Sequence, residues 1–161
     1  MSNSPSVAVL LAAYNGMEWI EEQVSSILSQ KSISIEIFIS VDLSNDKTHE
    51  WCQGLAEKNS HVKILPYGEK FGGAAKNFFR LIRDVDFSCF DYVALSDQDD
   101  IWDSSKLHHA IRTIEQDSLD GYSSDVIAFW SNGREKLVKK SFPQKKFDYF
   151  FEAAGPGCTY V

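Results

Sequence analysis

The sequence predicts an α/β protein with a mostly parallel sheet and helices on both faces. Short apolar runs of strand length alternate with longer stretches whose apolar residues recur every three or four positions. The apolar runs are nearly continuous, which is typical of strands that are covered on both faces. The chain has 161 residues, 43% of them hydrophobic, which suits one globular domain with its own core.

The predicted strands follow one another along the whole chain. They comprise residues 7–12, 35–41, 62–65, 92–95 and 126–130. The third ends before Pro66, whose backbone has no N–H to donate to a sheet. Because helical stretches separate these runs, we expect right-handed crossovers between parallel strands.

Helices are predicted between the strands. Residues 48–58 read as one helix, and residues 74–83 read as another with Phe78, Leu81 and Ile82 on one side. Two more are marked by apolar positions at helical spacing, namely Ile20, Val24, Ile27 and Leu28, and then Leu107, Ala110, Ile111 and Ile114. These stretches have the length and period of amphipathic helices that pack on a sheet.

Two local features complete the expected organisation. Asn15 can cap the first helix, with Glu18 three residues on as its capping-box partner. Residues 134–146 carry six basic residues and one proline, and we expect a mobile excursion there. The aromatic residues 147–151 are expected either to form a short helix on the sheet or to be a surface exposed by missing sequence.

Charge and cysteine usage exclude several functions. The net charge of −7 argues against nucleic acid, because phosphate backbones are held by surplus Lys and Arg. Three cysteines without C-x-x-C spacing indicate reduced thiols and a cytoplasmic protein. No apolar stretch approaches the roughly 20 residues that span a bilayer, so membrane contact is expected to be peripheral or supplied by further sequence.

Polar segments after four of the strands point to one site. Ligands of open α/β sheets bind beyond the carboxyl ends of the strands. This rule selects residues 13–16, 42–46, 68–76 and 96–103, which are rich in polar, glycine or acidic residues. The first of them lacks the G-x-G-x-x-G fingerprint of dinucleotide-binding folds, which argues against the hypothesis of a dehydrogenase.

The segment 96–103 is the most informative of the four. It holds four carboxylates within seven residues, which repel one another unless a cation offsets them. Asp97 and Asp99 lie two apart at a strand end, so in extended geometry they leave the same face. One can hold a ribose and the other a Mg²⁺ or Mn²⁺ ion that takes its other ligands from phosphates and water. Helix capping is the alternative, and we expect it for Asp103.

The other segments offer weaker signals, each with a structural alternative. Tyr14 can stack on a base or pack at a strand end. Asp42 can accept the N3–H of a pyrimidine or can be a turn residue, whereas Asp46 is expected to cap a helix. Lys76 lies in the first turn of a helix, where a cation and free N–H groups suit an anion, or it is a solvated surface lysine.

These four segments, in this order, resemble family 2 of the inverting glycosyltransferases, which has the Rossmann-like GT-A fold. The string LSDQDDIW at residues 95–102 resembles the bacterial rhamnosyltransferase branch. The resemblance implies that Asp97 binds the ribose, Asp99 the metal and Asp42 the base. It also implies that residues 155–159 border the donor sugar and acceptor. The residues expected to bind substrate are Ala13, Tyr14, Asn15, Asp42, Lys76, Asp97 and Gln98, with Asp99 as the metal ligand.

The chain departs from the family pattern in two ways. Val41 and Leu43 stand where the usual Asp-Asp-Gly-Ser motif has its first acid and its glycine. The resemblance also places the general base beyond Val161. We therefore expect residues 1–161 to be a single nucleotide-sugar-binding domain, the N-terminal part of a glycosyltransferase that lacks its acceptor and base segment. Such a chain would bind donor but turn over poorly, since a general base contributes about 10²–10⁴-fold.

The resemblance thus implies a metal-assisted inverting glycosyltransferase. The expected cofactor is Mg²⁺ or Mn²⁺, and the expected donor is a dTDP- or UDP-sugar, with dTDP-rhamnose favoured. The expected acceptor is a saccharide or lipid-linked saccharide of a cell-wall polysaccharide, made at the inner face of the membrane. Alternatives are a sugar-phosphate nucleotidyltransferase, which would want a Gly-rich, Arg-containing loop after the first strand, and a non-catalytic nucleotide-binding or interaction module.

Overall fold

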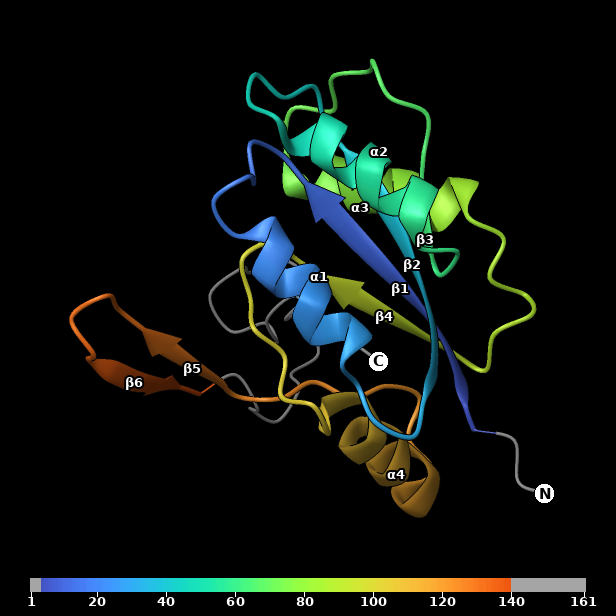
Figure 1. The fold of residues 1–161 in the computed structure, drawn as a ribbon. Coiled ribbons are helices and arrows are strands. Elements are labelled where there is room, and N and C mark those ends of the chain that lie inside the picture. The colour runs from blue at the N-terminus through green and yellow to red at the C-terminus, as the bar shows by residue number, and fades with distance from the viewer. Residues whose placement is uncertain (1–3, 140–161) are drawn as a thin grey trace.

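A parallel four-stranded sheet forms the centre of the molecule, in a computed structural model that describes residues 4–139 (Figure 1). Its strands are β1 (Ser6–Ala13), β2 (Ser34–Val41), β3 (Val62–Ile64) and β4 (Tyr92–Ser96). Their order across the sheet is β3-β2-β1-β4, and every neighbouring pair is parallel. The first four predicted strands are therefore confirmed, each to within a residue or two.

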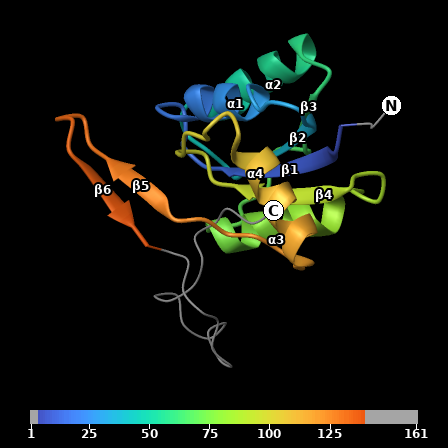
Figure 2. The same cartoon turned by 90° about the horizontal axis from the view of Figure 1, so that it is seen from below.

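Helices cover both faces of the sheet, as the sequence predicts. Figure 2 shows α1 (Ile20–Leu28) and α2 (Thr48–Lys58) on one side of the strands and α3 (Ala74–Asp84) on the other. A fourth helix, α4 (Lys106–Asp117), adds Leu107, Ala110 and Ile111 to the core on the α1 side. The α/β class with two covered faces is confirmed.

Each face of the sheet has its own core because successive strand residues point to opposite sides. In β1, Val7, Val9 and Leu11 pack toward α1, α2 and α4, whereas Leu10 and Ala12 pack toward α3. All of these are fully buried or nearly so. Double coverage explains why the strand is a continuous apolar run rather than an alternating one.

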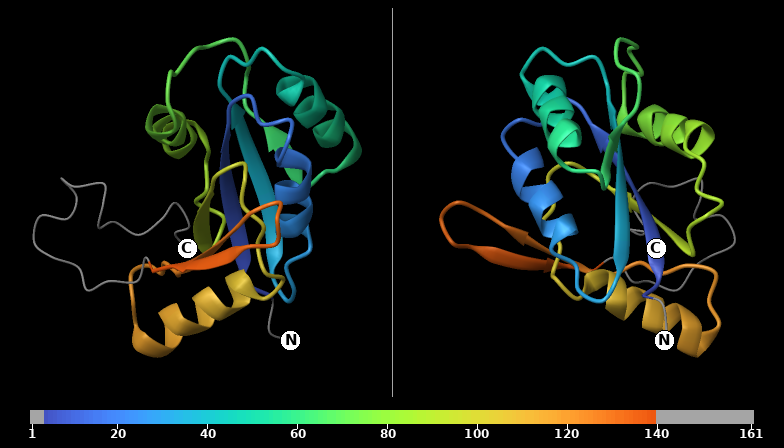
Figure 3. Two further views of the ribbon diagram at one scale, coloured as in Figure 1. Left: turned by 90° about the vertical axis from the view of Figure 1, so that its left-hand side faces the viewer. Right: turned by 45° about the vertical axis from the view of Figure 1, so that its right-hand side comes forward.

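The fifth predicted strand is present but lies outside the main sheet. β5 (Val126–Phe129) pairs antiparallel with β6 (Glu135–Val138), and this hairpin projects from the body of the molecule (Figure 3). The expectation of an excursion over residues 134–146 is wrong where β6 lies, and residues 140–146 fall outside the described part. The local cause is the Asn132-Gly133 turn, in which Gly133 has a φ of 77°.

The expected capping box at the first helix is wrong. α1 begins at Ile20 without a side-chain cap, and the carbonyl of Gly16 accepts the N–H groups of Trp19 and Ile20. Asn15 has a left-handed φ of 45° and accepts the Asn45 N–H through Oδ1 at 2.9 Å. In α3, Ile82 is 46% exposed, so it does not share the buried side of Phe78 and Leu81.

Some expectations concern residues with no structural description. Residues 147–151 and 155–159, together with Cys158, fall outside the described part of the chain. Within residues 4–139, Cys52 is a buried free thiol and Cys89 an exposed one. Of the helices in this range, none has the length and apolar character needed to cross a membrane.

Candidate active site

A cavity of about 510 Å³ opens at the carboxyl ends of β1, β2 and β4. It lies where the topology rule places ligands in an open α/β sheet. All four segments selected from the sequence contribute to the lining, and Ala12 and Asn77 are added from just outside them. The lining residues are Ala12, Ala13, Tyr14, Asp42, Lys70, Gly72, Gly73, Ala74, Asn77, Asp97, Gln98 and Asp99. Pocket volumes of this size suit a small ligand or cofactor.

Asp42 is buried at the end of β2 and holds the loop that bounds the cavity. Its Oδ1 accepts the N–H groups of Leu43 at 2.7 Å and Phe71 at 2.8 Å, and its Oδ2 accepts that of Gly72 at 2.8 Å. Burial raises the pKa of Asp42, but the hydrogen bonds from Phe71, Gly72 and Leu43 outweigh it and leave the pKa below its usual value. Asp42 is therefore an ionised anchor for residues 71–72 as well as a lining residue.

Gln98 fastens the β4 segment to the β1 segment. Its Oε1 accepts the Tyr14 N–H at 2.8 Å, and its Nε2 donates to the Tyr14 carbonyl at 2.9 Å. The side-chain amide of Gln98 thus pairs with both the backbone N–H and the backbone carbonyl of Tyr14, as a residue of a neighbouring strand does. The ring of Tyr14 stays 52% exposed beside the cavity. Gln98 thus fixes the backbone that presents this aromatic face.

Gly16 is packed against Gln98, and this contact can be tested. A Cβ at Gly16 would lie 2.3 Å from Gln98 Oε1. We expect Gly16→Ala to push the flexible Gln98 side chain away from Tyr14, weakening nucleotide binding by about tenfold. The unfolding free energy should fall by only about 1 kcal/mol, because a side-chain end rather than backbone must move.

Two comparisons check this effect, with affinity measured by calorimetry. Gly54→Ala is the matched control, because a Cβ there meets nothing within 4 Å and lies in α2. It should raise stability by about 0.5–1 kcal/mol and leave affinity unchanged. In a Gln98→Ala background, Gly16→Ala should have no further effect on affinity. A full tenfold loss in that background would mean that Gly16 acts without Gln98.

The acidic segment after β4 brings several carboxylates to the cavity. Asp97 and Asp99 line it, with Asp97 half-buried and Asp99 exposed. Burial raises the pKa of the neighbouring Asp100, and the charges of Asp97 and Asp99 raise it further. Burial also lowers the pKa of Lys106 to about 8, although Asp100 opposes this. The carboxylates therefore repel one another, which a cation at the cavity would relieve.

The donor set fits a hard divalent cation that shares its ligands with phosphate. Among residues 4–139, no group of three or more His, Cys, Asp or Glu side chains is arranged to hold a metal. Mg²⁺ commonly takes only one or two carboxylates and completes its shell with substrate phosphates and water. Asp97 and Asp99 supply carboxylates of that kind at the cavity wall.

The structure brings together most of the predicted substrate residues. Ala13, Tyr14, Asp42, Asp97 and Gln98 line the cavity beside Asp99, whereas Asn15 and Lys76 are not among its lining residues. Lys76 is exposed on α3. Their contacts with a substrate, like those of the lining residues, stay predictions.

The cation at the cavity wall is Lys70 rather than Lys76. The sequence favours Lys76 because it lies in the first turn of a helix, and the resemblance to family 2 marks Asn77 as the residue that follows it. No local signal singles out Lys70. Asn77 is buried in α3 and donates through Nδ2 to the carbonyls of Ala13 and Ser40.

The family model described as glycosyl transferase family 2 matches residues 8–156. The chain belongs to this family. It is 53% identical over 152 residues to the dTDP-rhamnosyl transferase RfbG of Shigella flexneri, in an alignment that covers 94% of this chain and 53% of that protein. The chain therefore spans about half the length of this relative. The resemblance to family 2 and to a rhamnosyltransferase is thus confirmed.

Solved structures of glycosyltransferases share the fold. TarS of S. aureus, residues 1–349 in complex with UDP-GlcNAc, aligns with a TM-score of 0.63 at 21% identity, covering 86% of this chain and 37% of that one. The mannosyltransferase PcManGT of Pyrobaculum calidifontis, in complex with GDP-Man and Mn²⁺, aligns with a TM-score of 0.61 at 21% identity, over 73% of this chain and 34% of that one. These likenesses confirm the expected GT-A fold.

Proposed function

We propose that this chain is the donor-binding part of a metal-dependent inverting glycosyltransferase. Its donor would be a dTDP- or UDP-sugar, with rhamnose the favoured sugar, and its acceptor a saccharide or lipid-linked saccharide. The observation that carries the proposal is that Tyr14, Asp42, Asp97 and Asp99 line one and the same cavity at the strand ends. The identity of 53% to a dTDP-rhamnosyl transferase supports the choice of nucleotide and sugar.

The base, the ribose and the diphosphate of the donor would each meet a suitable group among the residues that line the cavity. The exposed ring of Tyr14 offers a face on which a pyrimidine can stack. Asp42 Oδ2 accepts one backbone N–H in the hydrogen bonds described above, and carboxylate oxygens can accept a second donor such as the base N3–H. Asp97 would accept hydrogen bonds from the ribose hydroxyls, and Lys70 would face the diphosphate.

A bound Mg²⁺ or Mn²⁺ would stabilise the negative charge of the diphosphate as it leaves. Asp99 would be its protein ligand. In an acidic chain of net charge −7, this ion and Lys70 would offset the repulsion between donor and protein. The same proposal includes the general base that the resemblance places after Val161. It also includes the division into donor and acceptor parts and a cytoplasmic setting at the membrane face.

Binding of nucleoside diphosphates tests the proposed function directly. In Mn²⁺, calorimetric titration should show that dTDP and UDP bind at least about tenfold more tightly than GDP and ADP. Chelation of the metal should remove most of that affinity. Equal binding of purine and pyrimidine diphosphates would refute base reading by Asp42. No binding of any nucleotide would refute the donor site and leave a non-catalytic module, while the family match already speaks against a nucleotidyltransferase.

A further inference from the structure

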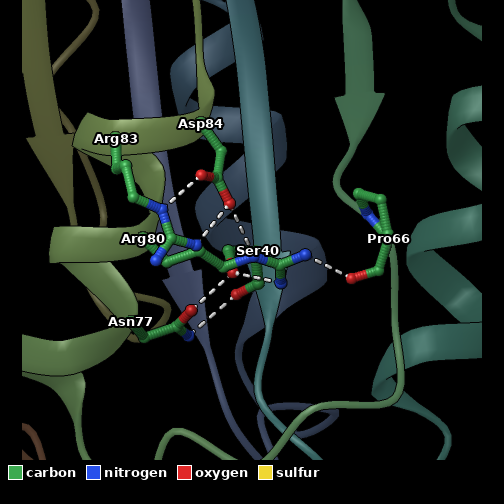
Figure 4. Close-up of polar contacts among 6 residues, drawn as sticks. All are labelled: Ser40, Pro66, Asn77, Arg80, Arg83 and Asp84. Atoms are coloured by element: carbon green, nitrogen blue, oxygen red, sulfur yellow. Dashed lines mark hydrogen bonds and ion pairs between the residues drawn. The ribbon is translucent and has the colours of Figure 1, made fainter.

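Arg80 is a buried cation that the proposed donor site does not use. It lies in α3 with a side chain only 6% exposed. One guanidinium nitrogen donates to Ser40 Oγ at 3.0 Å and another to the Pro66 carbonyl, while Nε lies 3.5 Å from Asp84 Oδ2 (Figure 4). Burying a charged group is costly unless its hydrogen bonds are met. A buried guanidinium with these partners therefore acts within the structure and does not serve to keep the surface soluble.

The contacts of Arg80 continue toward the floor of the cavity. Ser40 Oγ, which accepts from Arg80, donates to Asn77 Oδ1 at 2.5 Å. Asn77 in turn donates to the carbonyls of Ser40 at 2.9 Å and Ala13 at 3.3 Å. Asn77 and Ala13 both line the cavity. The network therefore connects α3 with the ends of β1 and β2 directly beneath the candidate site.

Arg80 also holds both ends of the loop at residues 66–71. Its guanidinium binds the Pro66 carbonyl at the start, and its Cζ lies 4.9 Å from the centre of the Phe71 ring at the end. The loop between them is exposed, and Gly68 has a left-handed φ of 122°. Little core packing is available to order such a segment, so polar tethers must do so. Asp42 supplies a second tether through the Phe71 and Gly72 N–H groups, and Tyr67 a third through its hydroxyl, which accepts the Ser44 N–H at 3.1 Å.

We propose that Arg80 is a positioning residue that orders residues 66–72 and so presents Lys70 to the bound nucleotide. Arg80 is not among the residues that line the cavity, so it acts through the loop. Lys70 is the charged residue of this loop that lines the cavity. The effect on nucleotide affinity rests on the proposed function, whereas the ordering of the loop does not.

Arg80→Gln, Arg80→Lys and Arg83→Gln form a matched set for the test. Arg83 lies on the same helix and binds the same Asp84, but its side chain is 71% exposed (Figure 4). Amide hydrogen exchange without nucleotide should speed up at Phe71 and Gly72 in Arg80→Gln while staying unchanged at Leu10. Affinity for dTDP in Mn²⁺ should fall by about tenfold. Arg83→Gln should change neither quantity, and Arg80→Lys, which keeps the charge but has one donor group, should lie between.

The possible outcomes separate the two proposals. A folded Arg80→Gln with unchanged exchange at Phe71 and Gly72 would overturn the positioning role. So would faster exchange with unchanged dTDP affinity, provided that the wild-type protein binds dTDP. If the wild-type protein binds no nucleotide, the proposed function fails and exchange alone decides the role of Arg80. If Arg80→Gln does not fold, Phe71→Leu removes the ring beneath the guanidinium, and unchanged exchange at Gly72 in it would overturn the proposal.

Discussion

Asp99→Ala is expected to abolish metal-dependent binding of nucleoside diphosphates while leaving the fold intact. Asp99 is exposed at the cavity wall, so its removal opens no gap in the core. Loss of the protein ligand to the metal should weaken dTDP binding in Mn²⁺ by at least about a hundredfold. Calorimetric titration measures this loss, and thermal unfolding checks the fold.

Asp103→Ala is the matched control for Asp99. It removes an exposed acid from the same segment, but this carboxylate accepts the Ser105 N–H at 2.8 Å and the Ser105 hydroxyl at 2.5 Å. Its removal should lower thermal stability slightly, as the loss of a capping side chain does, without changing nucleotide affinity. Wild-type affinity in Asp99→Ala would show that Asp99 is not a metal ligand.

Asp42→Asn should be the most destabilising conservative change at the site. Three backbone N–H groups, from Leu43, Phe71 and Gly72, converge on the buried carboxylate. An amide offers one acceptor oxygen and turns its NH₂ group toward at least one of these donors. We expect a loss of roughly 3 kcal/mol in unfolding free energy and a Tm lower by about 6–12 °C. Nucleotide affinity should fall as well, because the loop at residues 71–72 is released.

The pH dependence of the unfolding free energy tests whether the ionised carboxylate of Asp42 is the source of this stability. Because its pKa in the folded protein lies below the ordinary value of 3.8, its contribution is fully present above that value and is lost as the pH falls through the folded pKa. The stability difference between wild type and Asp42→Asn should therefore be constant near neutral pH and shrink below a pH of about 4. Denaturant unfolding from pH 7 to pH 3 measures it.

Asp91→Asn is a suitable control for this change. Asp91 accepts the N–H and hydroxyl of Ser6 at 2.8 and 2.7 Å, but it is exposed at the opposite end of the sheet. Its removal should alter stability far less than that of Asp42, and nucleotide affinity should not change. Equal stability of Asp42→Asn and the wild-type protein at pH 7 would contradict the anchoring role of Asp42.

The sequence predicted the main elements well because their signals are local. The helix over residues 48–58 was placed at its observed bounds, and β1 and β2 follow from apolar runs that both faces of the sheet bury. The hairpin was missed for a different reason. The apolar run at residues 126–130 by itself predicts a parallel strand, whereas the Asn132-Gly133 turn that follows it directs the chain back into an antiparallel hairpin.

The contacts within the site could not be predicted, because they join segments far apart in the sequence. Gln98 pairs with Tyr14 across 84 positions, and Asp42 binds Phe71 and Gly72 across about 30. Side chains at strand ends reveal which edge of a sheet is polar, but not which N–H each carboxylate receives. Arg80 was missed similarly, since an arginine in a helix is most often solvated.

The position of the divalent ion is the most direct test of the proposed site. Mn²⁺ broadens the amide NMR signals of residues near it. With dTDP present, broadening should be strongest at Asp97 and Asp99, weaker at Gly72, and absent at Ser6 and Asp91 at the far end of the sheet. Broadening centred on the acidic residues Glu21 and Glu22 of α1, or broadening that dTDP does not change, would contradict a donor site at the end of β4.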